Sequence, residues 1–372
     1  MKKIKLLLSS LLLMLIGLGG IPTPALATDS PVCLTAKECL PLAKQGGAEA
    51  QFNLGVMHVN GWYVDRDSHK ARNWFLKAAR QGYAKAQYNL GIIHASGDGV
   101  PQDYKKAYDW FLAASKQGYA EAQYRLGLLS FAGDTQNYED ARKWYYKAAK
   151  QGHTTSQFHL ALIYQEGLGT PQDYREAHRW YLKAAKQGHV EAQVVMGVLY
   201  DNGLGVEKNN KEVWRWWLKA AKQGHAEAQF GVANRYLNGL GVEKSIEKAI
   251  VWHTKSAQNG FAGSQAMLGM MYYAGWHVSQ DYKEAHHWLL KAAKQGVVGS
   301  QMFLGLAYIN GNGVPQNYLE AYAWMNIAAA QNDPKAKINR DILIKQLDPA
   351  SLREAQKLSA KYYSMYVEPF NK

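Results

Sequence analysis

The stretch AQYNLGIIHASGDGVPQDYKKAYDWFLAASKQG, from Ala86 to Gly118, decides how this chain folds, because similar stretches recur along its 372 residues. Each copy contains a glutamine near its start. The intervals between these glutamines are 36 residues, apart from one of 34, for Gln51, Gln87, Gln123, Gln157, Gln193, Gln229, Gln265 and Gln301. Self-similarity at such a fixed period is typical of a repeat architecture.

Each copy predicts two helices. The first contains the glutamine and ends at a glycine such as Gly97 or Gly203, a residue suited to closing a helix. The second begins after a residue that can cap a helix N-terminus, in the series Asp67, Asp103, Asn137, Asp173, Asn209, Ser245, Asp281 and Asn317. The identical glycine-rich segments at 203–208 and 239–244 are therefore interpreted as joints between two helices.

A tryptophan follows each glutamine at a fixed offset, apart from the shortened copy, in the series Trp74, Trp110, Trp144, Trp180, Trp216, Trp252, Trp288 and Trp324. Small residues, such as Gly91 in a first helix and Ala184 in a second, allow the helices to approach closely. We expect the tryptophan to fill the space between them, since a buried indole removes about 150–250 Å² from water. Repeated eight times, this packing predicts one continuous core.

These motifs, seen as AQVVMGVLYDNGLGV and DYREAHRWYLKAAKQG, resemble the Sel1-like repeat. The resemblance covers about residues 48–332 and implies an all-α fold: a right-handed α/α superhelical solenoid related to tetratricopeptide repeats, with its first helices on the concave side. Segments 28–47 and 333–372 are predicted to be N- and C-terminal caps, because the ends of a solenoid need polar covers.

The first 27 residues have the pattern of an export signal. Three lysines precede an apolar run, and Ala25 and Ala27 form a small-residue cleavage site. The run of about 13 apolar residues is shorter than the roughly 20 that a membrane-spanning helix needs. We expect a mature chain from Thr28, without a membrane span, in the periplasm or outside a Gram-negative-type cell.

Cys33 and Cys39 are the only two cysteines, and an oxidising compartment favours a disulfide between them. Within one helix, residues six apart would lie about 9 Å apart, too far for a bridge. We expect a helix that begins near Cys39, with Pro41 in its first turn and Cys33 in an irregular segment before it.

The sequence offers no catalytic, cofactor or metal site. The glycine-rich loops lack the Lys-Ser/Thr of a phosphate loop, and His153, His189 and His225 occupy a repeat position that other copies fill with Tyr, Phe or Val. Ser245 and Lys248 match Ser-x-x-Lys, but the other penicillin-recognising motifs are missing. Some cysteine-rich Sel1 proteins are linked to penicillin binding, so an enzyme acting on cell-wall peptides or β-lactams is the alternative, although their repeat cysteines are absent here.

The formal net charge of +13 has a structural explanation. Lysines and arginines recur near the ends of the second helices, where they complement the helix dipole. Their distribution around the outside, together with export, argues against nucleic acid. Weak attraction to anionic envelope polymers is the remaining expectation.

A partner is expected on the concave face, at the residues one, five, eight and nine after each glutamine. Aromatic side chains and polar anchors there suit a protein or an extended peptide. The candidates are Phe52, Tyr88, Tyr124, Phe131, Phe158, Phe230, Tyr273, Asn60, Glu166, Asn202, Asn238 and Asn310. The open alternative is that the aromatics pack between neighbouring repeats. The resemblance implies a non-catalytic scaffold for protein–protein interaction, directed at an envelope protein or, as for some exported relatives, a host protein with a role in virulence.

Overall fold

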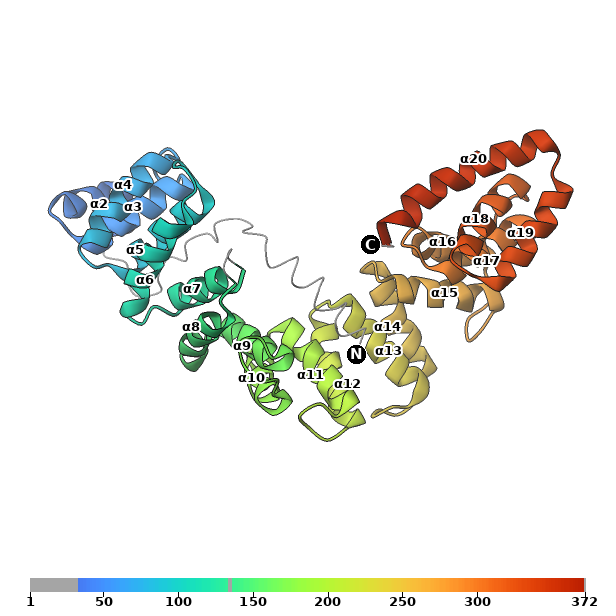
Figure 1. Ribbon diagram of the computed structural model, residues 1–372, viewed down its shortest axis with the longest axis horizontal. Coiled ribbons are helices and arrows are strands. Elements are labelled where there is room, and N and C mark those ends of the chain that lie inside the picture. Colours follow the sequence, from blue (N-terminus) through green and yellow to red (C-terminus); the bar gives the residue numbers. More distant parts are fainter. Residues whose placement is uncertain (1–32, 133–135, 371–372) are drawn as a thin grey trace. The chain divides into compact units, whose positions relative to one another are not determined.

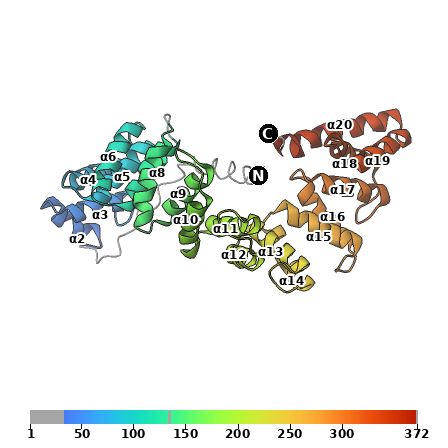
Figure 2. The same cartoon turned by 60° about the horizontal axis from the view of Figure 1, so that its bottom comes forward.

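The computed structural model describes residues 33–132 and 136–370, and the predicted signal segment 1–27 lies outside them. The described residues form 19 α-helices, one short 3-10 helix and no strand (Figures 1 and 2). They confirm the prediction of an all-α solenoid of helix pairs. The chain divides into two compact units, Met1–Gln187 and Gly188–Lys372, which are described separately.

The first unit holds the helices of repeats one to four and a helix that precedes them. They are α2 (Ala36–Lys44), α3 (Ala48–Asn60), α4 (Ser68–Arg80), α5 (Ala84–Ser96), α6 (Tyr104–Lys116), α7 (Ala120–Ala132), α8 (Tyr138–Lys150), α9 (Thr154–Glu166) and α10 (Tyr174–Lys186). The odd-numbered members from α3 onward are the first helices of their repeats, and each packs against the even-numbered helix that follows it.

The second unit continues the same alternation through repeats five to eight. Its helices are α11 (Val190–Asn202), α12 (Asn210–Lys222), α13 (Ala226–Asn238), α14 (Ile246–Gln258), α15 (Ala262–Ala274), α16 (Tyr282–Ala293), α17 (Val298–Asn310) and α18 (Tyr318–Ala330). Two further helices, α19 (Pro334–Gln346) and α20 (Pro349–Tyr366), pack against α18, and the 3-10 helix η1 (Glu368–Phe370) follows.

The predicted helix boundaries are confirmed. The eight predicted N-cap side chains each accept a hydrogen bond from a backbone N–H in the first turn of their helix, as Asp173 does from Arg175 and Glu176. Gly97 and Gly203 close their first helices in the left-handed conformation, with φ values of 76° and 71°. Glycine takes up this conformation without the steric cost that a Cβ would add.

The side chain that fills the space above the small residue of the first helix is not the tryptophan, which corrects the sequence-based expectation. A Cβ built on Gly55 would lie 2.5 Å from the ring of Phe75, and one on Gly91 would lie 2.5 Å from Phe111. Both rings directly follow the repeat tryptophan and are fully buried. One residue turns a helix by about 100°, so the tryptophan itself lies beside this contact.

The recurring glutamine has a structural role that the sequence pattern did not reveal. The Gln265 side chain donates through Nε2 to the carbonyl of Ala257, at the end of the preceding α14, at 3.0 Å. Its Oε1 accepts from Nε2 of Gln295, at the end of α16, at 2.8 Å. The same pair of bonds recurs at Gln87, which donates to Ala79 and accepts from Gln117. Gln87 and Gln265 therefore each tie together the C-terminal ends of two successive second helices.

Each glycine-rich loop connects the two helices of one repeat and can pack against the preceding repeat. A Cβ on Gly241 would lie 2.1 Å from the carbonyl oxygen of Asn210, at the start of the preceding repeat's second helix. Tyr63 and His277 replace the equivalent glycine in repeats one and seven, and both have positive φ, at 61° and 62°. The close approach at Gly241 confirms a packing role for this loop.

The predicted disulfide is present, with the Cα atoms of Cys33 and Cys39 5.1 Å apart. The expected helix start is wrong: α2 begins at Ala36 with Thr35 as its N-cap, so Pro41 lies inside the helix. The bridge is still feasible because Cys33 precedes the helix, and α2 packs against α3.

Candidate protein-binding surface

Two of the aromatic residues predicted to contact a partner lie in the core. Phe52 and Phe158 are each 3% exposed. Phe52 packs against Phe75, with ring centroids 5.7 Å apart, and Phe158 packs against Tyr181 at 5.5 Å. Both rings are core residues that pack on the second helix of their own repeat, which corrects the prediction that they face a partner.

The other predicted aromatics also contact core residues. Phe131 is buried against Tyr138 and Tyr145, which corrects the prediction for this residue as well. The half-buried members each pack on a ring of their own or the next repeat: Tyr88 on Phe111, Tyr124 on Tyr145, Phe230 on His253, and Tyr273 on Phe303. Partner contact through the exposed remainder of these four rings stays a prediction.

The polar residues nine positions after the glutamine lie at the ends of first helices. Asn60, Asn202 and Asn238 each donate through Nδ2 to the backbone carbonyl four residues earlier, at 2.8–3.0 Å. The Glu166 carboxylate accepts from Nε2 of Gln165 at 3.0 Å. The three asparagine bonds satisfy backbone carbonyls at the ends of the first helices. Asn310 is exposed at the end of α17.

The side chains that are accessible on the first helices lie about one residue further along the chain than predicted. In repeat eight, Gln301, Met302 and Gly305 are buried, whereas Phe303 and Leu306 are half-buried. Successive residues differ by about 100° around a helix, so positions two before and two, five and nine after the glutamine share one side. We call this side the first-helix surface. Positions one and eight turn instead toward the second helix.

The first-helix surface differs in chemistry between the units. Two residues after the glutamine, the first unit has only polar or charged residues, Asn53, Asn89, Arg125 and His159, and the second unit has Val195, Gly231, Met267 and Phe303. Asn53, His159 and Gly231 are buried, and the other five residues are half-buried. Five residues after the glutamine, every repeat except the sixth carries an apolar residue, and repeats seven and eight carry Met270 and Leu306. The adjacent helices α15 and α17 therefore carry large, half-buried apolar residues at both of these positions.

Glycine replaces larger residues at the N-terminal end of this apolar surface. Two residues before the glutamine, repeats one, two, three, five and six carry a charged residue, whereas repeats seven and eight carry Gly263 and Gly299. A Cβ on Gly299 would meet no atom within 4 Å. Since glycine weakens a helix by about 0.5–1 kcal/mol relative to alanine, and no neighbour requires it at position 299, its effect there is to leave open space beside Phe303. At Gly263 the ring of Phe261 fills this space, 2.7 Å from a Cβ built there.

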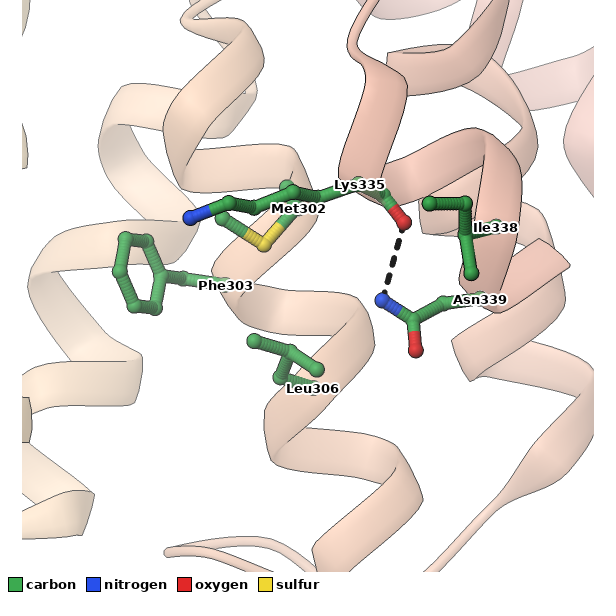
Figure 3. A pocket seen from close by; sticks show the side chains of 6 residues that line it. All are labelled: Met302, Phe303, Leu306, Lys335, Ile338 and Asn339. Carbon is green, nitrogen blue, oxygen red and sulfur yellow. Dashed lines mark hydrogen bonds between the residues drawn. The ribbon is translucent and has the colours of Figure 1, made fainter.

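An open groove lies between α17 and α19, with a volume of about 270 Å³. Figure 3 shows Met302, Phe303 and Leu306 of α17 and, across from them, Lys335, Ile338 and Asn339 of α19. The dashed line in the figure is the bond that Asn339 donates to the Lys335 carbonyl, at 3.0 Å. The Asn339 amide is therefore engaged within α19. Apart from Lys335, the other residues that line the groove are apolar.

Helix α19 exposes large apolar side chains beside positive charges. Ile338 is 62% exposed and Ile342 is 49% exposed. The one acidic residue inside the helix, Asp341, is paired with the neighbouring Arg340 at 2.7 Å. Lys335 belongs to none of the ion pairs found among the described residues. The groove is therefore apolar and has the Lys335 cation at its edge.

The residues considered for chemistry have structural roles. The Ser245 hydroxyl accepts from the backbone N–H of Lys248 and donates to Glu247, so it caps α14. The Lys248 ammonium lies 5.6 Å from the ring centroid of Tyr236. Within residues 33–132 and 136–370, no cluster of three or more His, Cys, Asp or Glu side chains is arranged to hold a metal ion.

Many of the basic residues are engaged with tryptophan. The lysine three residues after the repeat tryptophan lies over its ring, at 3.8 Å for Lys183 on Trp180 and 4.1 Å for Lys219 on Trp216. The same arrangement occurs at Lys77, Lys147, Lys255 and Lys291. A Trp-x-x-Lys spacing on a helix is the sequence signal for such cation–π pairs, which the sequence analysis missed.

No helix in the described part of the chain combines the length and the apolar character needed to cross a membrane. The comparisons with known proteins concern the repeats. A family model described as the Sel1 repeat matches residues 48–83, 84–119, 120–153, 154–189, 190–225, 226–261, 262–297 and 298–333.

Two solved structures of similar proteins cover most of the chain. A Sel1 repeat protein from Oxalobacter formigenes is 31% identical with a TM-score of 0.67, over 84% of this chain and 90% of that one. A protective antigen present in uropathogenic Escherichia coli strains is 30% identical with a TM-score of 0.49, over 90% of this chain and 87% of that one. No curated protein matches the chain significantly.

Proposed function

Because the chain belongs to the Sel1 repeat family, whose fold typically mediates protein interaction, we propose that it is an exported, non-catalytic scaffold that binds a protein through the first-helix surface of its second unit. This proposal is supported by a group of half-buried apolar side chains on the adjacent helices α15 and α17, at positions two and five after the glutamine: Met267, Met270, Phe303 and Leu306. At position two, repeats one to four carry polar or charged residues instead. Neighbouring apolar side chains that stay partly accessible are typical of a protein-interaction site.

Export is supported by two features that lie close together in the chain. The N-terminal segment has the charge and hydropathy pattern of a cleaved signal, and Cys33 and Cys39 form a disulfide directly after it. Disulfides persist in oxidising compartments such as the periplasm and the cell exterior. The partner is accordingly an envelope or host protein.

A non-catalytic role is supported by how Ser245 is used. Its hydroxyl is occupied in capping α14, and the Lys248 ammonium lies by the ring of Tyr236. A serine nucleophile needs a base within hydrogen-bond reach. The enzyme alternative therefore has no observation in its favour.

The proposal is tested by chemical crosslinking in intact cells that export the chain, followed by quantitative mass spectrometry of the captured proteins. Met270→Glu places a charge on the apolar surface and should reduce the captured partner about tenfold or more, as truncation of a central contact does. Val251→Glu is the matched control, since Val251 is 52% exposed on the second helix α14. Equal capture by the two variants would contradict the proposed surface.

A further inference from the structure

We infer that the groove between α17 and α19 receives an acidic amphipathic helix of the partner protein. Its apolar side chains enter between Phe303, Leu306 and Ile338, and one of its carboxylates pairs with Lys335. The inference rests on the proposed function, because it names the chemistry of the partner that the first-helix surface binds. It is argued from the shape, the polarity and the charge of this groove.

The groove suits side chains of a macromolecule better than a free small molecule. Its volume of about 270 Å³ is below the roughly 300–1,000 Å³ of typical small-molecule pockets, and it is open along one side. Phe303 is held in place by Tyr273, with ring centroids 5.2 Å apart in an edge-on arrangement. The apolar floor is therefore a fixed feature of α15 and α17.

The polarity of the groove favours a helix over an extended peptide. An extended peptide leaves its backbone N–H and C=O groups unpaired, and these cost free energy when buried without partners. The amide of Asn339 already donates within its own helix, so the walls have few groups left to pair with a peptide backbone. A helix satisfies its backbone internally and presents apolar residues at spacings of three and four.

The apolar residues continue beyond the groove in the way that such a helix requires. Met267 and Met270 on α15 lie at the same repeat positions as Phe303 and Leu306 on α17. Methionine is flexible and polarisable, and it is common on surfaces that bind amphipathic helices. Gly299, near the N-terminal end of α17, leaves space for a second backbone to approach, since a Cβ there would meet no atom within 4 Å.

Charge decides the polar side of the partner. Lysines at 335, 337 and 345 make α19 basic, whereas Asp333 is used as its N-cap and Asp341 pairs with Arg340. Opposite charges across an interface favour the encounter and fix its register. A second copy of this chain would bring the lysines of its own α19 to the groove, so a partner with acidic residues fits better.

The test is selection of peptides from a display library of random sequences about 16 residues long, using the full mature chain with its disulfide intact. The length is near the minimum at which a helix becomes marginally stable in water. We expect the selected sequences to carry apolar residues at spacings of three or four and an excess of Asp and Glu. Circular dichroism should show that they gain helicity on binding.

Matched variants of α19 locate the binding site. Ile338→Asp should weaken the selected peptides about tenfold or more, whereas Ile344→Asp, a 38% exposed residue on a different side of the same helix, should leave the affinity unchanged. Both positions are exposed, so both variants should fold, which a melting curve checks. Lys335→Glu should weaken the same peptides, Lys337→Glu should not, and peptides with Lys in place of Glu should regain affinity for Lys335→Glu.

The outcomes separate this inference from the proposed function. Helical acidic peptides that respond to Ile338→Asp and Lys335→Glu support both. Peptides that bind with unchanged affinity to both variants overturn the inference, and the proposed function then stands only if Met270→Glu weakens them. Failure to select any peptide counts against both. Binding of the chain to anionic lipid vesicles, or a dimer that Ile338→Asp dissociates, would overturn the inference by identifying a membrane or a second copy as the occupant.

Discussion

The glutamine that marks each repeat acts at the ends of helices. Gln265 accepts from Gln295 and donates to the carbonyl of Ala257, so one side chain serves two second helices. It is nearly inaccessible to water. A buried amide left without its partners costs more than the bonds contribute when formed, so the same residue type is needed in every repeat.

Replacing Gln265 should therefore destabilise the second unit. Gln265→Ala leaves the Ala257 carbonyl and the Gln295 amide without this partner, and we expect a loss of about 1–3 kcal/mol in the free energy of unfolding, measured by urea denaturation. The exposed Gln295→Ala should cost less. A double-mutant cycle in which the two losses simply add would contradict the coupling between these side chains.

A single histidine should make stability depend on pH. His253 is 1% exposed against Phe230, and burial lowers its pKa to about 4. The unfolded chain, with a histidine pKa of about 6.5, binds the proton more readily than the folded chain does. This contribution to stability is complete above pH 6.5 and decreases as the pH falls toward 4, by about 3 kcal/mol at most.

The comparison variant is His253→Phe, since Phe75 and Phe111 occupy the same repeat position. Denaturation curves between pH 7 and pH 4, measured by fluorescence, should show a smaller loss of stability for this variant than for the natural chain. Other histidines with lowered pKa values, such as His94 and His153, are common to both proteins. Equal losses in the two proteins would show that His253 does not titrate as proposed.

At the scale of elements, the caps of the repeat helices were predicted correctly, whereas the start of α2 was not. The caps at Asp173 and Gly203 depend on local backbone geometry, so their residue types and spacing were sufficient to place them. The partner surface was predicted about one residue away from the accessible side of the first helix. Its position depends on the direction from which the second helix packs. Phe52 and Phe158 follow the glutamine directly and turn toward that helix, whereas Phe303, one residue further on, does not.

Part of this error in the predicted surface could have been avoided from the sequence alone. Glycine four residues after the glutamine marks the side of the first helix that faces its partner helix, and positions about 100° apart can be counted from it. The cap helix α19 could not be placed in this way, because it lies outside the repeat pattern. The groove at Lys335 and Ile338 therefore became visible only in the structure.

Two helix glycines, Gly269 of repeat seven and Gly299 of repeat eight, should respond in opposite ways to the same substitution. Gly299→Ala on α17 adds a Cβ in open space and should stabilise the second unit by about 0.5–1 kcal/mol. Gly269→Ala on α15 places a Cβ 2.6 Å from Leu289 and should destabilise it by about 1–3 kcal/mol. Thermal melting of both variants measures the difference, and shifts of the same sign would contradict the assigned packing.

At the scale of the whole molecule, the proposed function requires that the chain is exported and loses its signal segment before it acts. We expect the protein recovered from exporting cells to begin at Thr28 and to contain no free thiol, because Cys33 and Cys39 are joined. Intact-mass spectrometry with and without reduction, after treatment with an alkylating agent, measures both properties. A full-length mass, or two alkylated cysteines without reduction, would contradict export through an oxidising compartment.

The division of surface chemistry between the units is the basis of the functional account. Repeats one to four carry polar residues where repeats seven and eight carry Met267 and Phe303, although both units share the same helix pairs. The repeat pattern therefore explains stability throughout, and the residues that vary between repeats determine where a partner binds. The C-terminal helix α19 extends this variable surface beyond the last repeat.

The most direct test of this account is photo-crosslinking from a single position. A benzophenone amino acid at Met270 should form a covalent product with a partner protein in intact cells, because its side chain lies on the proposed surface. The same amino acid at Val251, exposed on α14, should not. Products from Val251 with none from Met270 would contradict the claim that this scaffold binds through the first helices of its second unit.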